Sequence, residues 1–466
     1  MRTVKGEEVS SAEAHTAAAV TRAAKLLGVP EERVGFRAWR AYTVLRALWR
    51  ARRRVRRSSR SAPPGARRVC MLLERSENLA QDARVRREIR ALTRAGYRVV
   101  LVHAGEEGDD PSLSSDGALL RGVGGRGGLL ARLPAGLGRA VSWARFARAA
   151  ARARPDVVHA HDVTMLAPSW FASKAAGAKL VYDTHEYAAG VPYRSGAARR
   201  LVSLLERLLV PRCAAVIAVS DAVADRVQED RGLARRPAVI RNVPELDWGP
   251  SPHSGEAVAD LRRDLALDDA PLVLHQGAAT PGRGCEQLVE AVASLDGVHL
   301  LFLGDFAPGF RAVLTAAADR CGADERVHLL PSVRAEALLA HTRQADVGAC
   351  LLDPSCLNHR LTLQNKLFEY IAAGLPVVAT RDTEFGRLVE ELGVGWTTPV
   401  HDTATLTAAV ARALEERDDP GLRDRLAAAA RELNWEKEQG RLLAVYAGVS
   451  PDWDASIGVG RVSAAT

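Results

Sequence analysis

Short runs of β-branched and aliphatic residues alternate with helix-like segments, and this alternation constrains the fold more than any other feature. Before residue 250 the runs are VCMLL (69–73), YRVVLVH (97–103), DVVHAHD (156–162), KLVYDTHE (179–186) and AAVIAVS (214–220). After residue 270 they are PLVLHQG (271–277), HLLFLGD (299–305), VHLLP (327–331), VGACLL (347–352) and LPVVAT (375–380). Repeated βα units build open parallel sheets that helices cover. The sequence therefore predicts an α/β protein with two doubly wound, Rossmann-like domains.

The positive charge of the chain is concentrated in one segment near the N-terminus. The net charge is +8, yet residues 33–68 hold thirteen arginines and no acidic residue. Apolar residues recur at helical spacing through residues 33–57, which indicates a basic amphipathic helix. Such a helix can lie on an anionic membrane surface, or it can pack on the protein with its arginines in solvent. Binding to nucleic acid ranks last, because no nucleic-acid module accompanies the arginines.

Three segments follow from these patterns. We expect an N-terminal extension with the basic helix and a Ser/Pro/Gly linker (1–65), a first domain (66–250) and a second domain (251–433). The last amphipathic segment is 434–449. Six cysteines without a CxxC pair favour a reducing, cytoplasmic location. No apolar run reaches the roughly 18 residues of a spanning helix, and association with the inner membrane face remains open.

The stretch LTLQNKLFEYIAAGLPVVAT (361–380) combines a cation, a carboxylate and a helix start. Gly374 and Pro376 mark the end of a short helix ahead of a buried strand. Lys366 and Glu369 are three residues apart and share one face of that helix. A helix N-terminus offers unpaired N–H groups to phosphate. The alternative is an ordinary surface Lys–Glu pair.

NKLFEYIAAGLPVVAT resembles the donor-site helix of retaining GT-B glycosyltransferases of the family 4 type. Further motifs match this family in order: DARVRREIRALTRAGYRVVLV (82–102), VVHAHD (157–162), AVIAVSDAVADRV (215–227) and VIRNVPE (239–245). The resemblance implies a GT-B fold, with two domains facing across a cleft. It assigns the last segment, 434–449, to the first domain. It also implies transfer of a sugar from a nucleoside-diphosphate sugar, with UDP-sugar favoured, to a glycan, lipid-linked or small-molecule acceptor. Retention of anomeric configuration, no cofactor and no metal are further expectations from the resemblance.

The resemblance assigns His161 and Arg283 to catalysis, because these positions contact the donor sugar and its phosphates in relatives. Lys366 is assigned with them as the cation at the helix start, which can offset a phosphate-binding cation that relatives carry and this chain lacks. Arg283 lies in a turn between two glycines, and its guanidinium suits bidentate phosphate contact. The expected donor-binding set is Gly277, Val333, Leu363, Gln364, Asn365 and Glu369, with Glu369 on ribose hydroxyls and the Val333 backbone near the base. Ligands bind beyond the carboxyl ends of parallel strands. By position, this places Asp183, His185 and Glu186 on the acceptor side.

The chain departs from the family pattern at three places. Ala278 occupies the place of a usual arginine, and Leu361 replaces the first glutamate of the paired-Glu motif. The loop after the first strand, LLERSENLAQDAR (72–84), lacks glycine. Asn358, His359 or backbone amides near 363–365 are the candidates to replace the missing carboxylate. Two alternatives therefore stay open: a sugar-nucleotide epimerase of the same fold, and a non-catalytic GT-B partner subunit.

Overall fold

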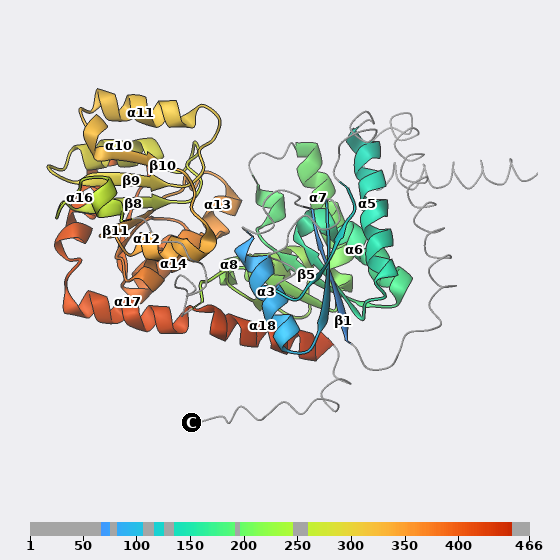
Figure 1. Cartoon of the computed structure of the whole chain (residues 1–466). Coiled ribbons are helices and arrows are strands. Elements are labelled where there is room, and N and C mark those ends of the chain that lie inside the picture. Colours follow the sequence, from blue (N-terminus) through green and yellow to red (C-terminus); the bar gives the residue numbers. More distant parts are fainter. Residues whose placement is uncertain are drawn as a thin grey trace, which may run out of the picture. The chain divides into compact units, whose positions relative to one another are not determined.

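The computed structural model describes residues 67–74, 82–105, 116–124, 135–191, 196–245 and 260–449. The predicted basic helix at 33–57 and its linker lie outside these residues. The described residues form two parallel β-sheets with helices on their faces (Figure 1). The prediction of two doubly wound α/β units is confirmed.

The first sheet has seven strands in the order β3-β2-β1-β4-β5-β6-β7. The strands are β1 (Arg68–Leu73), β2 (Arg98–His103), β3 (Leu119–Gly122), β4 (Val157–His161), β5 (Lys179–Thr184), β6 (Ala215–Ala218) and β7 (Ala238–Val239). The helices of this part are α3 (Ala83–Arg94), α5 (Ala135–Arg152), α6 (Asp162–Ala176), α7 (Gly196–Leu209) and α8 (Asp221–Arg231), with short 3-10 turns η3 (Ala188–Gly190) and η4 (Val210–Arg212). The strand order reverses between β1 and β4, which is where ligands of such sheets bind.

The second sheet has six strands in the order β10-β9-β8-β11-β12-β13. They are β8 (Leu272–Gln276), β9 (His299–Leu303), β10 (Val327–Leu330), β11 (Val347–Cys350), β12 (Val377–Thr380) and β13 (Gly395–Thr398). The helices are α9 (Leu261–Asp264), α10 (Cys285–Ala293), α11 (Phe310–Arg320), α12 (Ala335–Thr342), α13 (Leu357–Leu361), α14 (Asn365–Ala373), α15 (Glu384–Leu392), α16 (Thr403–Glu415) and α17 (Pro420–Glu432), with the 3-10 turn η5 (Asp324–Arg326). This order reverses between β8 and β11.

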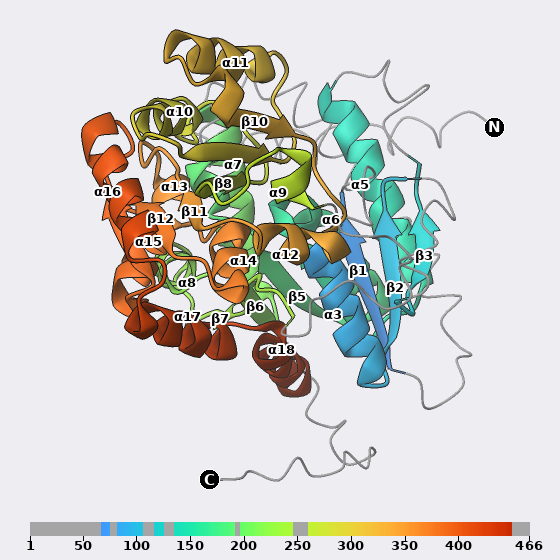
Figure 2. The same cartoon turned by 60° about the vertical axis from the view of Figure 1, so that its left-hand side comes forward.

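The four central strands of the second sheet, β9, β8, β11 and β12, are buried on both faces. On β8, Leu272 and Leu274 belong to one apolar core and Val273 to the other. Helices α10, α11 and α16 cover one face, and α14 packs beside α17 on the opposite face (Figure 2). A strand covered on both faces has a continuous apolar sequence, which explains why these strands could be predicted from apolar runs.

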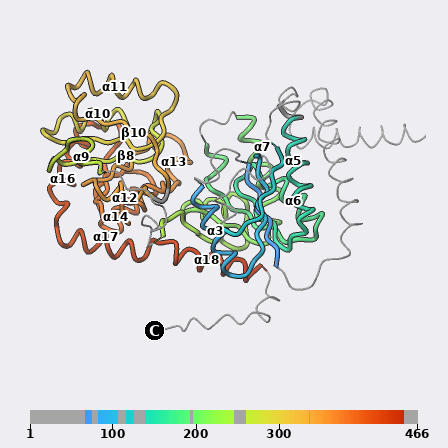
Figure 3. The backbone as a smooth tube through the Cα atoms, viewed as in Figure 1, coloured from blue at the N-terminus to red at the C-terminus, as the bar shows by residue number. Residues whose placement is uncertain are grey.

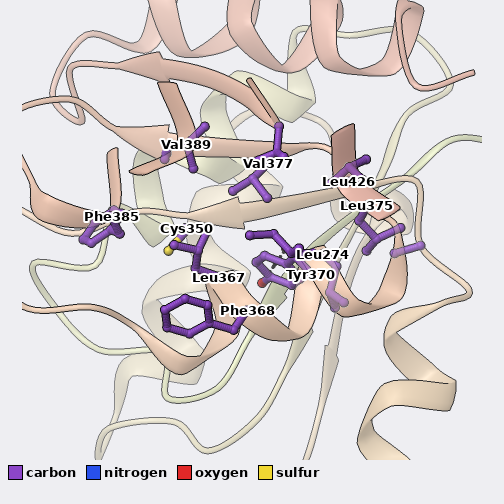
Figure 4. Close-up of a cluster of buried hydrophobic side chains, with 14 of the residues drawn as sticks. Leu274, Cys350, Leu367, Phe368, Tyr370, Leu375, Val377, Phe385, Val389 and Leu426 are labelled. Atoms are coloured by element: carbon purple, nitrogen blue, oxygen red, sulfur yellow. Dashed lines mark hydrogen bonds between the residues drawn. The ribbon is translucent and has the colours of Figure 1, made fainter. Parts of the chain in front are cut away.

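Tyr370 fixes helix α14 on the sheet (Figure 4). Its hydroxyl donates to the Leu274 carbonyl at 3.1 Å and accepts from the Gln276 N–H at 2.9 Å. The ring lies against Gly348 of β11, where a Cβ atom would come within 2.4 Å of ring carbons. Gly348 therefore allows the close approach that brings the first turn of α14 to the end of β8.

Helix α18 (Trp435–Val449) ends the described chain and lies beside α3 and β7 (Figure 3). The Trp435 N–H donates to the Pro244 carbonyl at 2.8 Å. Glu438 is fully buried and accepts hydrogen bonds from Arg241 and Arg441. No helix among the described residues is long and apolar enough to cross a bilayer.

Candidate active site

Lys366 is buried in the first turn of α14, at the carboxyl end of β8. Its side chain is 5% exposed, and its Nζ lies 3.2 Å from Nε2 of His275, the penultimate residue of β8. Burial, together with the charges of Lys366 and Arg283, holds the pKa of His275 well below its ordinary value. Neutral His275 can therefore accept a hydrogen bond from the Lys366 ammonium.

The ammonium of Lys366 has no carboxylate partner among the described residues. Burial lowers the pKa of Lys366 to about 8, and the nearby charge of Arg283 acts in the same direction. A buried cation without a counter-charge is costly unless an anion binds it. The site is therefore electrostatically suited to an anionic ligand.

Helix α14 also presents an open N-terminus at this point. The N-cap residue Gln364 makes no side-chain hydrogen bond to the first turn. Its Oε1 accepts a weak hydrogen bond from Cys350 Sγ at 3.6 Å, whereas its Nε2 is buried and has no partner among the described residues. The free N–H groups and the unused amide hydrogens are additional donors for an anion.

Arg283 is held in a tight turn between β8 and α10. The Arg283 N–H donates to the Thr280 carbonyl at 3.2 Å, and the Asp353 N–H donates to the Gly282 carbonyl at 2.7 Å. Gly284 has φ +62°, and an added Cβ would meet Val400 Cγ2 at 2.6 Å. Within the described part of the chain, the half-buried guanidinium of Arg283 forms no salt bridge. Its charge lies close enough to lower the pKa of Lys366.

Glu369 is joined to a chain of hydrogen bonds that starts on α12. Thr342 Oγ1 donates to Gln276 Oε1 at 2.6 Å, and Gln276 Nε2 donates to Glu369 Oε2. Burial raises the pKa of Glu369, and the Gln276 hydrogen bond and the charge of Lys366 oppose that rise. Gln276 thereby orients a carboxylate one helical turn from the Lys366 ammonium.

The other expected donor-side residues lie at the same end of the sheet. Gly277, with φ +89°, follows β8, and its carbonyl would be 2.1 Å from a Cβ on Gly304. Leu363 is 9% exposed and packs in the apolar core, as does the half-buried Val333. Asn365 is exposed. The structure thus brings Lys366, Arg283 and Glu369 into one neighbourhood.

In the first sheet, His161 is the last residue of β4 and is fully buried. Its ring stacks on His159, with 4.3 Å between centroids. Asp162, the next residue, has φ +65°, a conformation that costs a non-glycine residue energy. Its carboxylate accepts from the Val163 N–H at 2.5 Å. A strained backbone directly after His161 is a feature that clusters at functional sites.

Asp183, at the end of β5, is bound by a residue that sequence reasoning did not select. Arg84 Nε and a terminal Arg84 nitrogen donate to its two oxygens at 2.8 and 2.9 Å, and Arg84 also lies 3.1 Å from Glu88. Although burial acts to lower the pKa of Arg84, the charges of Asp183 and Glu88 raise it. The carboxylates of Asp183 and Glu88 could serve as metal ligands, but Arg84 forms a salt bridge with each of them.

His185 Nε2 lies 3.3 Å from Asp183, and its side chain is partly exposed. The Glu186 carbonyl accepts a hydrogen bond from Thr184 Oγ1 at 2.5 Å. The end of β5 and the turn that follows it therefore hold all three residues expected on the acceptor side.

Sequence reasoning also missed His275, Gln276 and Thr342. The signal was available in PLVLHQG, where two polar residues close an otherwise apolar strand immediately before a glycine. Polar side chains at the carboxyl end of a parallel strand are positioned to reach a ligand. Their partners could not be read from the sequence, because these lie on other elements.

Comparison with known proteins matches two family models to the chain. Residues 80–243 match the model of the glycosyl transferase 4-like domain, and residues 270–416 match that of glycosyl transferases group 1. A D-inositol 3-phosphate glycosyltransferase of Xylanimonas cellulosilytica is 31% identical over 319 residues, covering 63% of this chain and 72% of that relative. The chain belongs to the GT-B glycosyltransferases.

More distant relatives share the architecture of this glycosyltransferase. A glycogen synthase of Mycobacterium tuberculosis is 27% identical over 60% of this chain and 64% of its own length. Anabaena Alr3699/HepE, solved with UDP, superposes with a TM-score of 0.64 at 18% identity, covering 82% of this chain and 99% of that chain. A sucrose-phosphate synthase from Thermosynechococcus elongatus superposes with a TM-score of 0.63 at 18% identity, covering 82% of this chain and 98% of that chain. These solved structures establish the likeness of fold.

Proposed function

We propose that this glycosyltransferase moves a sugar from a nucleoside-diphosphate sugar, with a UDP-sugar favoured, to a glycan, lipid-linked or small-molecule acceptor with retention of configuration. The observation that carries the proposal is the Lys366 ammonium, which is buried without a carboxylate partner among the described residues. A diphosphate supplies the missing negative charge. The structure of Anabaena Alr3699/HepE with UDP-glucose supports the choice of nucleotide by analogy.

In this proposal the diphosphate rests on Lys366, Arg283 and the open first turn of α14. Negative charge grows on the diphosphate as the sugar leaves, so positive groups fixed in advance stabilise the transition state more than the ground state. Glu369, held by Gln276, accepts hydrogen bonds from the ribose hydroxyls. The Val333 backbone faces the base.

The remaining assignments also belong to the proposal. His161 contacts the donor sugar, and the turn of Asp183, His185 and Glu186 meets the acceptor. Lys366, Arg283 and the helix terminus perform the electrostatic work that a metal does elsewhere, so transfer proceeds without a metal. We place the enzyme in the cytoplasm, with the basic segment 33–57 as a contact to the inner membrane face.

A thermal-shift screen of UDP-, GDP- and TDP-sugars tests the donor, because a ligand that binds the native state raises its melting temperature. We expect the UDP-sugars to give the largest shift and Lys366→Ala to abolish it. The matched control is Lys179→Ala, which removes an exposed lysine at the amino end of β5. NMR of the anomeric proton of the product, with and without EDTA, then tests retention and metal independence.

Two outcomes would favour the alternatives. Release of an epimerised sugar nucleotide without acceptor would identify an epimerase. Failure of every nucleotide sugar to bind would identify a non-catalytic partner subunit.

A further inference from the structure

Helix α7 (Gly196–Leu209), labelled in Figure 1, carries exposed aliphatic side chains. Leu201 is 55% exposed and Leu208 is 49% exposed, which places both among the most exposed large apolar residues described. Glu206 is the one buried residue of this helix. An exposed group of large apolar side chains marks an interaction surface more often than a lone exposed leucine does.

Two hydrogen bonds to Glu206 fix the rotation of α7 about its axis. The Tyr182 hydroxyl donates to Glu206 Oε1 at 3.0 Å, and Arg231 donates to Oε2 at 2.8 Å. With Glu206 held inward, the leucines cannot turn toward the core without breaking a buried ion pair. The outward orientation is therefore a stable property of the fold.

The outer face of α7 combines leucines with arginines. Leu201, Leu204 and Leu208 recur at spacings of three and four, which puts them on one side of the helix. Arg200 and Arg207 directly precede two of these leucines and are exposed. We call these five residues the α7 face. Residues 196–212 contain four arginines, and their one acidic residue, Glu206, points inward.

We propose that the α7 face docks onto the headgroup region of an anionic lipid bilayer. Amphipathic helices with aliphatic residues and arginines lie in such interfaces, where the apolar side chains enter the acyl boundary and the cations meet anionic lipid. A second copy of this chain fits less well, because a two-fold contact sets the same arginines against one another. The segment 33–57 has the same sign of charge and is disfavoured for the same reason.

This surface is separate from the proposed donor site, and the inference does not depend on sugar transfer. It adds a second membrane contact to an enzyme in which only the segment 33–57 had been expected to provide one.

The test must report on α7 itself, since thirteen arginines in residues 33–68 also attract anionic vesicles. Ala197 is exposed and lies one turn before Leu201. We would place an environment-sensitive fluorophore on Ala197→Cys in the full chain, with Cys213, Cys321 and Cys356 changed to serine. The control label sits at Ala316→Cys on α11, which is also exposed. Vesicles contain phosphatidylcholine alone or with phosphatidylglycerol.

On vesicles with phosphatidylglycerol, the label at 197 shifts to the blue and is protected from iodide, whereas the label at 316 is unchanged. Leu201→Gln with Leu208→Gln weakens the apparent affinity of this response by roughly tenfold. Arg200→Gln with Arg207→Gln weakens it by roughly fivefold per arginine and lowers its salt dependence. The matched pair Val313→Gln with Arg320→Gln, on exposed positions of α11, has no effect.

A label at 197 that stays in water while the full chain binds the vesicles would overturn the proposal. So would protection that is already present without vesicles, or that rises with protein concentration, because the face would then be covered by protein. Melting temperatures of the variants, which we expect to be unchanged at these exposed positions, exclude misfolding as the cause.

Discussion

Replacing Lys366 with methionine is expected to stabilise the ligand-free protein while it removes diphosphate binding. Lysine carries an ordinary pKa of 10.5, and burial lowers the pKa of Lys366 to about 8. A shift of one pKa unit corresponds to about 1.4 kcal/mol, so the charged form of Lys366 destabilises the fold by about 3 kcal/mol. Methionine has a similar volume and no charge, and it removes this penalty.

The stability penalty of charged Lys366 depends on pH. The folded state holds the Lys366 proton less tightly than the unfolded state does, so the penalty is fully present below about pH 8. It decreases as the pH rises from about 8 toward 10.5. The stability difference between Lys366→Met and wild type is therefore largest at neutral pH and disappears at alkaline pH.

Urea unfolding followed from pH 7 to 10 measures this difference, and calorimetry with UDP measures binding. The control Lys179→Met changes an exposed lysine, and its effect on stability should be small and independent of pH. A Lys366→Met protein that is less stable at pH 7, or whose stability difference does not vary with pH, would refute the electrostatic reasoning. Binding of UDP at wild-type affinity would refute the placement of the diphosphate.

Three further predictions concern groups around Lys366. Arg283→Ala lowers kcat on the order of 10²-fold, because it removes a positive group from the diphosphate. The melting temperature is unchanged, because the guanidinium has no salt bridge in the described residues. Steady-state kinetics that show a preserved kcat would contradict this prediction. Gln276→Leu frees the carboxylate of Glu369 and raises KM for the nucleotide sugar more than it lowers kcat, whereas an effect confined to kcat would argue against a ribose contact. Gly284→Ala lowers the free energy of unfolding, measured in urea, by about 1–3 kcal/mol more than Gly309→Ala does. Both glycines have positive φ, but of the two only Gly284 lacks room for a Cβ. Equal losses would show that the backbone conformation alone matters.

The alternation of apolar runs and helices predicted the two parallel sheets, because strands buried on both faces leave continuous apolar segments in the sequence. Three strands were missed: Leu119–Gly122, Ala238–Val239 and Gly395–Thr398. They are two to four residues long and lie at the edges of the sheets. So few residues carry too little periodicity to distinguish a strand from a loop. The basic segment 33–57 stays a prediction, because it lies outside the described residues.

Arg283, Lys366 and Glu369 could be selected from the sequence, because they lie in short motifs that resemble the donor site of a known family. The hydrogen-bond partners of these residues could not be selected from the sequence. His275 accepts from Lys366 across 91 positions of sequence, and Gln276 reaches Glu369 across 93. No local pattern encodes such contacts.

By itself, the sequence determined the class of fold and supplied candidates for diphosphate binding, since periodicity, glycine placement and side-chain chemistry are local properties. The tertiary structure decided the charge balance of the site. It buried an ammonium that forms no salt bridge with a described carboxylate, and it turned the leucines of α7 outward by binding Glu206 on the inner side. Both depend on which groups the fold packs together, because desolvation and ion pairing are set by neighbours in space and not by neighbours along the chain.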